Sequence, residues 1–128
     1  MNAAPEKPLE KTLSLLDIAQ LGRIEKSKEI LKGFTVGLQT LSASNQQKIL
    51  ASLPSDNSDS LARFVYTQVE ALVYATADIN GTKYGDSNRA ELRTLYSSMQ
   101  SKVLQETYSF YGELVQEQNS VIDSLKKT

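Results

Sequence analysis

Cysteine and histidine are both missing from the 128 residues of this chain, and so is tryptophan. Without cysteine there is no disulfide, thiolate metal site or cysteine nucleophile, an absence that suits a reducing compartment without establishing one. Without histidine, the chain lacks the commonest acid–base group near neutral pH, the usual base of a catalytic triad, and the usual nitrogen ligand of zinc or iron. The composition therefore predicts a protein that is not an enzyme, with no catalytic residues, no cofactor and no metal site.

An excess of charge of one sign is lacking too, because 14 Lys and Arg oppose 15 Asp and Glu. No global field therefore favours nucleic acid or an anionic membrane as a partner. No apolar run approaches the roughly 18 residues of a membrane span, and the segment MNAAPEKPLEKT has charges and prolines where a signal peptide has an apolar core. We expect a cytosolic protein that binds neither nucleic acid nor membrane.

Sequence motifs of known chemistry are also missing, since GxGxxG, GxxxxGK[ST], HExxH and GxSxG do not occur. The segment DINGTKYGDSNR places Asp78, Asn80 and Thr82 at alternating positions, as a calcium loop does. However, Lys83 stands where the EF-hand loop has glycine, and Arg89 stands where it has a bidentate glutamate. We therefore reject calcium binding by this segment.

The amino-terminal part of the chain predicts a tail followed by a helix. Pro5 and Pro8 lie among small and charged residues, so residues 1–8 are expected to be a flexible tail and residues 9–128 a single helical domain. Apolar residues recur at helical spacing through residues 13–31, with a break or weak point expected at Gly22.

A change of period follows at Gly33. Phe34, Val36 and Leu38 alternate with polar or small residues, which is typical of a half-buried strand. Gly33 either ends the preceding helix or turns a hairpin whose first arm is residues 29–32. The strand needs a partner, either within the chain or on another molecule, and both alternatives stay open.

The middle of the chain predicts two helices and a turn. Ser42 or Ser44 is expected to cap a helix over residues 45–53, and Pro54 to end it before the polar loop SDNSDS. Residues 61–77 predict a central helix. Its expected core residues are Leu61, Phe64, Val65, Val69, Leu72, Val73 and Thr76. Residues 78–87 are then expected to form a loop around Asn80-Gly81, with Asp86 or Ser87 capping the next helix.

Residues 89–126 predict one long helix, because they contain no proline and their apolar residues recur every three or four positions. Two adjacent apolar rows make its face wider than a coiled-coil seam. The second row is Tyr96, Leu104, Tyr108, Tyr111, Val115 and Ile122. Any one tyrosine is more simply explained at the edge of a core, but a small bundle leaves part of this row for a partner. The candidate protein-interaction residues are Leu104, Tyr108, Tyr111, Val115 and Ile122.

The fold class predicted from these patterns is mainly α: a small helical bundle with one long carboxy-terminal helix and, as an open possibility, a short strand or hairpin near residues 29–41. The helix of residues 61–77 is expected to pack on the first half of the long helix. The amino-terminal helix or another molecule is expected to cover the second half.

The order of these pieces resembles the tail assembly chaperones and baseplate-hub assembly proteins of tailed bacteriophages. The resemblance covers residues 33–125 and rests on three segments: a strand leading into a helix, a helix running into an I-N-G turn, and a closing helix. They read GFTVGLQTLSASNQQKIL, VEALVYATADINGTKYGD and LYSSMQSKVLQETYSFYGELVQEQ.

The resemblance implies a non-enzymatic protein that binds a tail component, such as a tape measure or hub protein, in the host cell cytoplasm during virion assembly. It carries over no catalytic residue. The alternative is a structural virion or adaptor subunit whose helices form a homo-oligomeric interface. A homo-oligomer is compatible with either function.

Overall fold

The computed structural model describes residues 13–53 and 60–126, and it corrects the predicted fold class. The chain is a mixed α and β domain, because a four-stranded antiparallel sheet accompanies the helices. It is therefore not a plain helical bundle. The predicted tail of residues 1–8 and the breaker Pro54 lie outside the described residues.

The sheet is a meander in the order β1-β2-β3-β4. Strands β1 (Glu25–Leu31) and β2 (Phe34–Gln39) form a hairpin that turns at Gly33, whose φ is +88°. This confirms the strand predicted from Phe34, Val36 and Leu38 and the hairpin alternative. The helix predicted over residues 13–31 is wrong, since its second half is β1. The run RIEKSKEILK contains enough charge to resemble an exposed helical face, but cross-strand pairing overrides that local preference.

The second hairpin joins β3 (Thr76–Ile79) to β4 (Thr82–Lys83) through Asn80-Gly81. Asn80 has φ +50° and Gly81 φ +88°, which suits the tight turn of a two-residue hairpin. The Asn80 side chain accepts a hydrogen bond from the Thr35 amide at 2.9 Å and donates one to the Gly33 carbonyl at 3.0 Å. Asn80 therefore ties the two hairpin turns together.

Two helices are inserted between β2 and β3. Helix α2 (Ala43–Ser52) is capped by Ser42, one of the two serines predicted for this role, whose hydroxyl accepts from the Asn45 amide at 3.1 Å. Helix α3 (Ser60–Ala75) ends two residues earlier than predicted, because Thr76 and Ala77 belong to β3.

The long helix predicted over residues 89–126 is divided in two. Helix α4 (Arg89–Ser98) follows a short 3₁₀ turn, η2 (Asp86–Asn88), and α5 (Ser101–Leu125) follows α4. Met99 and Gln100 separate the two helices with extended ψ angles of 146° and 139°. Neither Asp86 nor Ser87 is the cap of α4, because the N-cap position belongs to Asn88 and makes no side-chain hydrogen bond.

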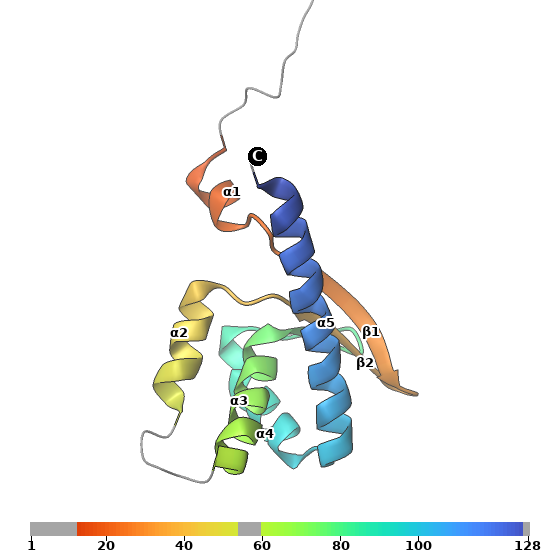
Figure 1. Ribbon diagram of the computed structural model, residues 1–128. Helices are drawn as coiled ribbons and strands as arrows, with labels where there is room; N and C mark the ends of the chain where they lie inside the picture. The colour runs from red at the N-terminus through yellow and green to blue at the C-terminus, as the bar shows by residue number, and fades with distance from the viewer. Residues whose placement is uncertain (1–12, 54–59, 127–128) are drawn as a thin grey trace, which may run out of the picture.

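Helix α5 runs along the β1–β2 hairpin, and α3 packs against both α4 and α5 (Figure 1). Lys26 and Lys28 of β1 pair with Glu117 and Glu113 of α5 at 2.6 and 3.7 Å. The hairpin thus lies along α5 around Glu113 and Glu117, and the segment after α1 reaches the turns beyond them. The core between these elements is Val36, Leu38, Val69, Leu72, Val73, Ala75, Leu92, Tyr96, Leu104, Phe110, Tyr111 and Leu114.

The remaining helix, α1 (Leu15–Ala19), is a single short turn beside the last turns of α5 (Figure 1). Gly22 follows it with φ +81°, so the expected break at this glycine is confirmed. The Gln118 side-chain amide donates to the Gly22 carbonyl at 3.1 Å and joins the amino-terminal segment to α5.

Candidate protein-binding groove

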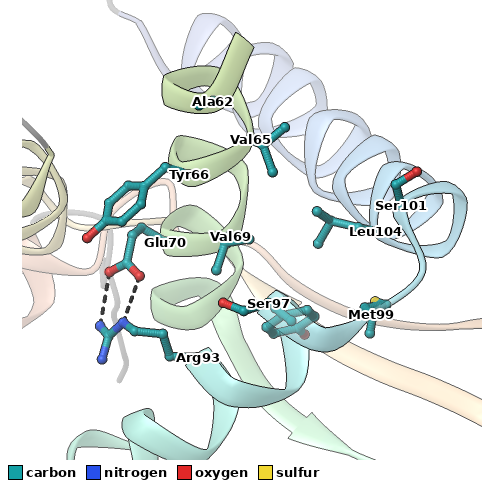
Figure 2. A pocket seen from close by; sticks show the side chains of 11 residues that line it. Ala62, Val65, Tyr66, Val69, Glu70, Arg93, Ser97, Met99, Ser101 and Leu104 are labelled. Carbon is teal, nitrogen blue, oxygen red and sulfur yellow. Dashed lines mark hydrogen bonds and ion pairs between the residues drawn. The ribbon is translucent and has the colours of Figure 1, made fainter. Parts of the chain in front are cut away.

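A groove of about 580 Å³ runs between the first half of α3, the end of α4 and the start of α5. We call it the α3–α5 groove. Val65 and Val69 of α3 face Leu104 of α5 across it, and Met99 closes one end (Figure 2). The other lining residues are Ala62, Tyr66, Glu70, Arg93, Tyr96, Ser97 and Ser101. Its walls are therefore largely apolar, with polar groups at the margins.

The groove exists because only half of α3 is covered. Residues 68–73 of α3 are buried, whereas its first turns lie against few other elements. Leu61, Phe64 and Val65 are exposed by 66%, 56% and 42%, so the prediction that these three belong to the core is wrong. Leu61 lies one turn before Val65 on the same helix face, and it extends the apolar surface of the groove along α3.

The break at Met99 and Gln100 shapes the opposite wall. An unbroken helix would have carried Leu104 along the α4 axis, but the two extended residues redirect the chain into α5. Leu104 is consequently brought opposite Val65, and its side chain is 5% exposed. Met99 is half-buried, and its flexible thioether suits a surface that adapts to a bound side chain.

A buried ion pair fixes α3 to α4 beside the groove. Arg93 Nε and Nη2 donate to the two carboxylate oxygens of Glu70 at 2.7 and 2.9 Å (Figure 2). The Glu70 side chain is 1% exposed and the Arg93 side chain 42% exposed. The hydrogen bond to Glu70, opposed in part by burial, raises the pKa of Arg93. This bidentate pair holds the carboxylate inside and leaves part of the guanidinium at the surface.

Beneath the groove, Tyr96 anchors α4 to the sheet. Its side chain is 1% exposed, and its hydroxyl lies 2.6 Å from Thr76 Oγ1. Thr76 donates its own proton to the Leu72 carbonyl at 2.7 Å, so Tyr96 is the donor to Thr76. Burial, partly offset by this hydrogen bond, raises the pKa of Tyr96 to about 12. The group is therefore a neutral structural donor at physiological pH, and catalysis by a tyrosinate is not favoured.

Charged groups of both signs lie at the rim of the groove. Arg93 presents its guanidinium there, and Lys102, one residue after the lining residue Ser101, is 80% exposed in its side chain. Lys102 lies 3.7 Å from Glu106, an exposed pair that salt screens strongly. An apolar groove of this kind is suited to the apolar face of an amphipathic helix.

The five predicted interaction residues do not form one exposed row. Leu104 and Tyr111 are core residues, exposed by 5% and 9%. Tyr108 is half-buried, with its ring 5.8 Å from that of Tyr111, and Val115 is also half-buried against the core. Ile122 is 39% exposed near the end of α5. Only Leu104 of the five lines the α3–α5 groove.

A second apolar surface lies at the other end of α5, around α1. We call it the end patch, and its members are Leu13, Leu15, Leu16, Ile18, Leu21, Ile122 and Leu125. Their exposed fractions, from 39% to 84%, together equal about four fully exposed leucines. Burying them would contribute about 6–12 kcal/mol before the costs of association are subtracted.

The described residues contain neither a cluster of metal-ligating side chains nor a membrane-spanning helix. In residues 13–53 and 60–126, no group of three or more histidine, cysteine, aspartate or glutamate residues could hold a metal ion. Within the same residues, no helix is long and apolar enough to cross a membrane.

Comparisons of the chain with models of known protein families, with curated proteins and with solved structures found no match. The resemblance to tail assembly chaperones therefore stays a prediction.

Sequence reasoning missed Val65 and Met99 as groove residues. Val65 was assigned to the core because helical periodicity does not reveal where along a helix its cover ends. The segment SSMQS did contain a signal for the break, since clustered serines are typical of loops. The Glu70–Arg93 pair had no local signal, because the two residues are 23 positions apart.

Proposed function

We propose that this chain is a non-enzymatic assembly protein that holds an apolar helix of a protein partner in the α3–α5 groove. The observation that supports this most directly is the exposure of Leu61 and Val65 beside a groove already lined by apolar side chains. Exposed apolar surface of this kind commonly marks a protein-interaction site. Its position on α3 and α5, both anchored in the core, keeps the groove preformed.

The occupant that fits is one amphipathic helix. A helix laid between α3 and α5 buries, in the groove, apolar residues spaced by three and four positions. The resemblance of residues 33–125 supplies the class of partner: a tape measure, hub or other tail component of a tailed bacteriophage. Binding in the host cell cytoplasm would keep that component soluble until it is assembled.

The test is capture of partners from infected cells by tagged full-length protein, followed by mass spectrometry. The groove variant is Ala62→Asp/Val65→Asp, which adds carboxylates at two exposed positions that line the groove. The matched control is Leu31→Asp/Leu50→Asp, at residues exposed by 47% and 67% that do not line the groove. The proposal expects a tail component with wild type and control, and its loss with the groove variant.

Two results would count against the proposal. Equal capture by the groove variant and the wild type would remove the groove as the binding site. Recovery of the chain in stoichiometric amounts from purified virions would favour the structural-subunit alternative over a transient assembly role. Circular dichroism of each variant shows whether it is folded before capture is compared.

A further inference from the structure

Helix α1 differs from the other α-helices in the described residues because none of its residues is buried. Leu15 and Leu16 are exposed by 84% and 80%. The turn is held by a capping box, in which Ser14 Oγ accepts from the Asp17 amide at 3.1 Å and the Asp17 carboxylate accepts from the Ser14 amide at 3.4 Å. A helix of five residues has little stability in water on its own, so α1 presents two leucines without packing to support them.

A hollow lies beside this projection. It measures about 310 Å³ and is lined by Leu21, Gly22, Ile122, Leu125 and Lys126. A Cβ atom on Gly22 would come within 3.0 Å of Ile122, so the chain passes close to α5 here. The end of the molecule therefore combines an apolar projection with an apolar hollow on adjoining segments.

We propose that the end patch binds a second copy of this chain across a two-fold axis, with α1 of each copy in the hollow of the other. A two-fold interface needs one surface that is complementary to itself. The projection of Leu15 and Leu16 and the hollow lined by Leu21 and Ile122 meet that requirement with groups from a single copy. Each contact is then made twice.

Charge placement agrees with this arrangement. Asp17 lies on the projecting helix and Lys126 at the margin of the hollow. Lys126 also pairs with Asp123 of its own copy at 3.1 Å, and the two side chains are exposed by 68% and 70%. Insertion of α1 into the opposite hollow brings Asp17 of one copy toward Lys126 of the other. Opposite charges thus meet at the margin of an apolar contact.

The apolar character of the end patch is suited to a homodimer. Each copy contributes the seven side chains of the end patch, and homodimer interfaces are more apolar at their centres than transient ones. The α3–α5 groove lies near the opposite end of α5 (Figure 1). A dimer formed through the end patch therefore leaves both grooves open, and this inference does not depend on the proposed function.

The first test is sedimentation equilibrium of the full-length chain over a range of concentrations. The expected mass is twice the 14.2 kDa of one chain. Leu15→Ser/Leu16→Ser is expected to raise the dimer Kd at least about a hundredfold, because each copy loses two buried leucines. The control Leu31→Ser/Leu50→Ser changes two exposed residues outside the end patch and leaves the Kd within about twofold.

The second test uses charge exchange. Lys126→Glu is expected to weaken the dimer, and Asp17→Asn/Lys126→Glu is expected to restore part of the lost affinity, because it removes the like-charge repulsion and keeps a side-chain oxygen that can accept from the Ser14 amide. Restoration identifies the contact, because Asp17 and Lys126 are not an ion pair within one copy in the described structure.

Because the chain has no natural cysteine, a spin label can be attached at one introduced cysteine in each copy. The distance between the two labels of a dimer can then be measured. Gln20→Cys, next to α1, is expected to give a short distance between the two labels, and Lys48→Cys on α2 a long one. A monomer at every concentration, an assembly that grows beyond two copies, or a shorter distance for Lys48→Cys would each overturn the proposal.

Discussion

Removing Arg93 should destabilise the fold far more than removing its partner Glu70. The Glu70 carboxylate is 1% exposed and depends on the guanidinium, whereas the Arg93 side chain is 42% exposed and can turn toward water. Two unit charges at about 4 Å attract by about 4 kcal/mol at an effective dielectric constant of about 20. Breaking a fully buried pair from one side costs about 3–5 kcal/mol. Because water can reach the space left by Arg93, we expect Arg93→Met to lower the free energy of unfolding by about 2–4 kcal/mol.

The complementary variants give smaller changes. Glu70→Leu removes the buried charge and frees an arginine that solvent can stabilise, so its expected cost is about 1 kcal/mol or less. Glu70→Leu/Arg93→Met replaces the whole pair by apolar groups of similar size and is expected to lie within about 1 kcal/mol of the wild type. The double variant is therefore more stable than Arg93→Met alone.

Urea unfolding followed by circular dichroism and by tyrosine fluorescence measures these differences, provided that the two transitions coincide. The test compares the free energies of unfolding of the two single variants, Glu70→Leu and Arg93→Met. If Glu70→Leu were as destabilising as Arg93→Met, the carboxylate would not be the buried partner that depends on the pair. A double variant less stable than Arg93→Met would contradict the argument as well.

Three further predictions concern the core and the turns. Titration of tyrosinate absorbance should contain a late component near pH 12 that disappears in Tyr96→Phe; its absence from the folded wild type would refute the burial argument. Because the pKa of Tyr96 is higher in the folded state than the usual value near 10, its stabilising contribution is complete below about pH 10 and is lost as the pH rises toward 12, which urea unfolding at several pH values can measure. Gly81→Ala should lower the free energy of unfolding by about 1–2 kcal/mol, since Gly81 has φ +88°. Gly112→Ala, inside α5 with open space at its Cβ position, should instead raise that free energy by as much as about 1 kcal/mol. Equal shifts in melting temperature for the two variants would show that backbone conformation is not the cause.

The elements with strong local signals could be predicted from the sequence. The alternation of Phe34, Val36 and Leu38 identified β2, because a strand exposes alternate side chains to opposite sides. Asn80-Gly81 identified a turn, because both positions need positive φ. Ser42 was among the predicted caps for the same kind of local reason.

The strands that were not predicted depend on contacts between segments that are distant in the sequence. Residues 25–31 have helical charge spacing, yet they pair with β2 and place Lys26 and Lys28 against α5. Thr76 continues an apolar run that is helical in pattern, but it pairs with Leu38 in the sheet. Neither pairing has a signature in the local sequence, so the prediction extended helices over β1 and over the first two residues of β3.

The candidate site was harder to predict than the fold, because it depends on what is left uncovered. Leu61, Phe64 and Val65 have the composition of core residues, and only the position of α4 and α5 leaves them exposed. Leu104 and Tyr111 show the opposite case: they were predicted to be available to a partner, but they are buried in the core of the protein. Periodicity identifies the apolar side of a helix but does not identify what packs on it.

Binding of one amphipathic helix to the α3–α5 groove is the central claim, and its most direct measurement is a titration monitored by NMR. The titrant is a tail-component segment captured by the wild-type protein, made as an isotopically unlabelled peptide. We predict shifts at the amides of Val65, Ser97 and Leu104, with at least tenfold weaker binding to Ala62→Asp/Val65→Asp than to Leu31→Asp/Leu50→Asp. Shifts confined to other surfaces, with equal affinities for the two variants, would contradict the account.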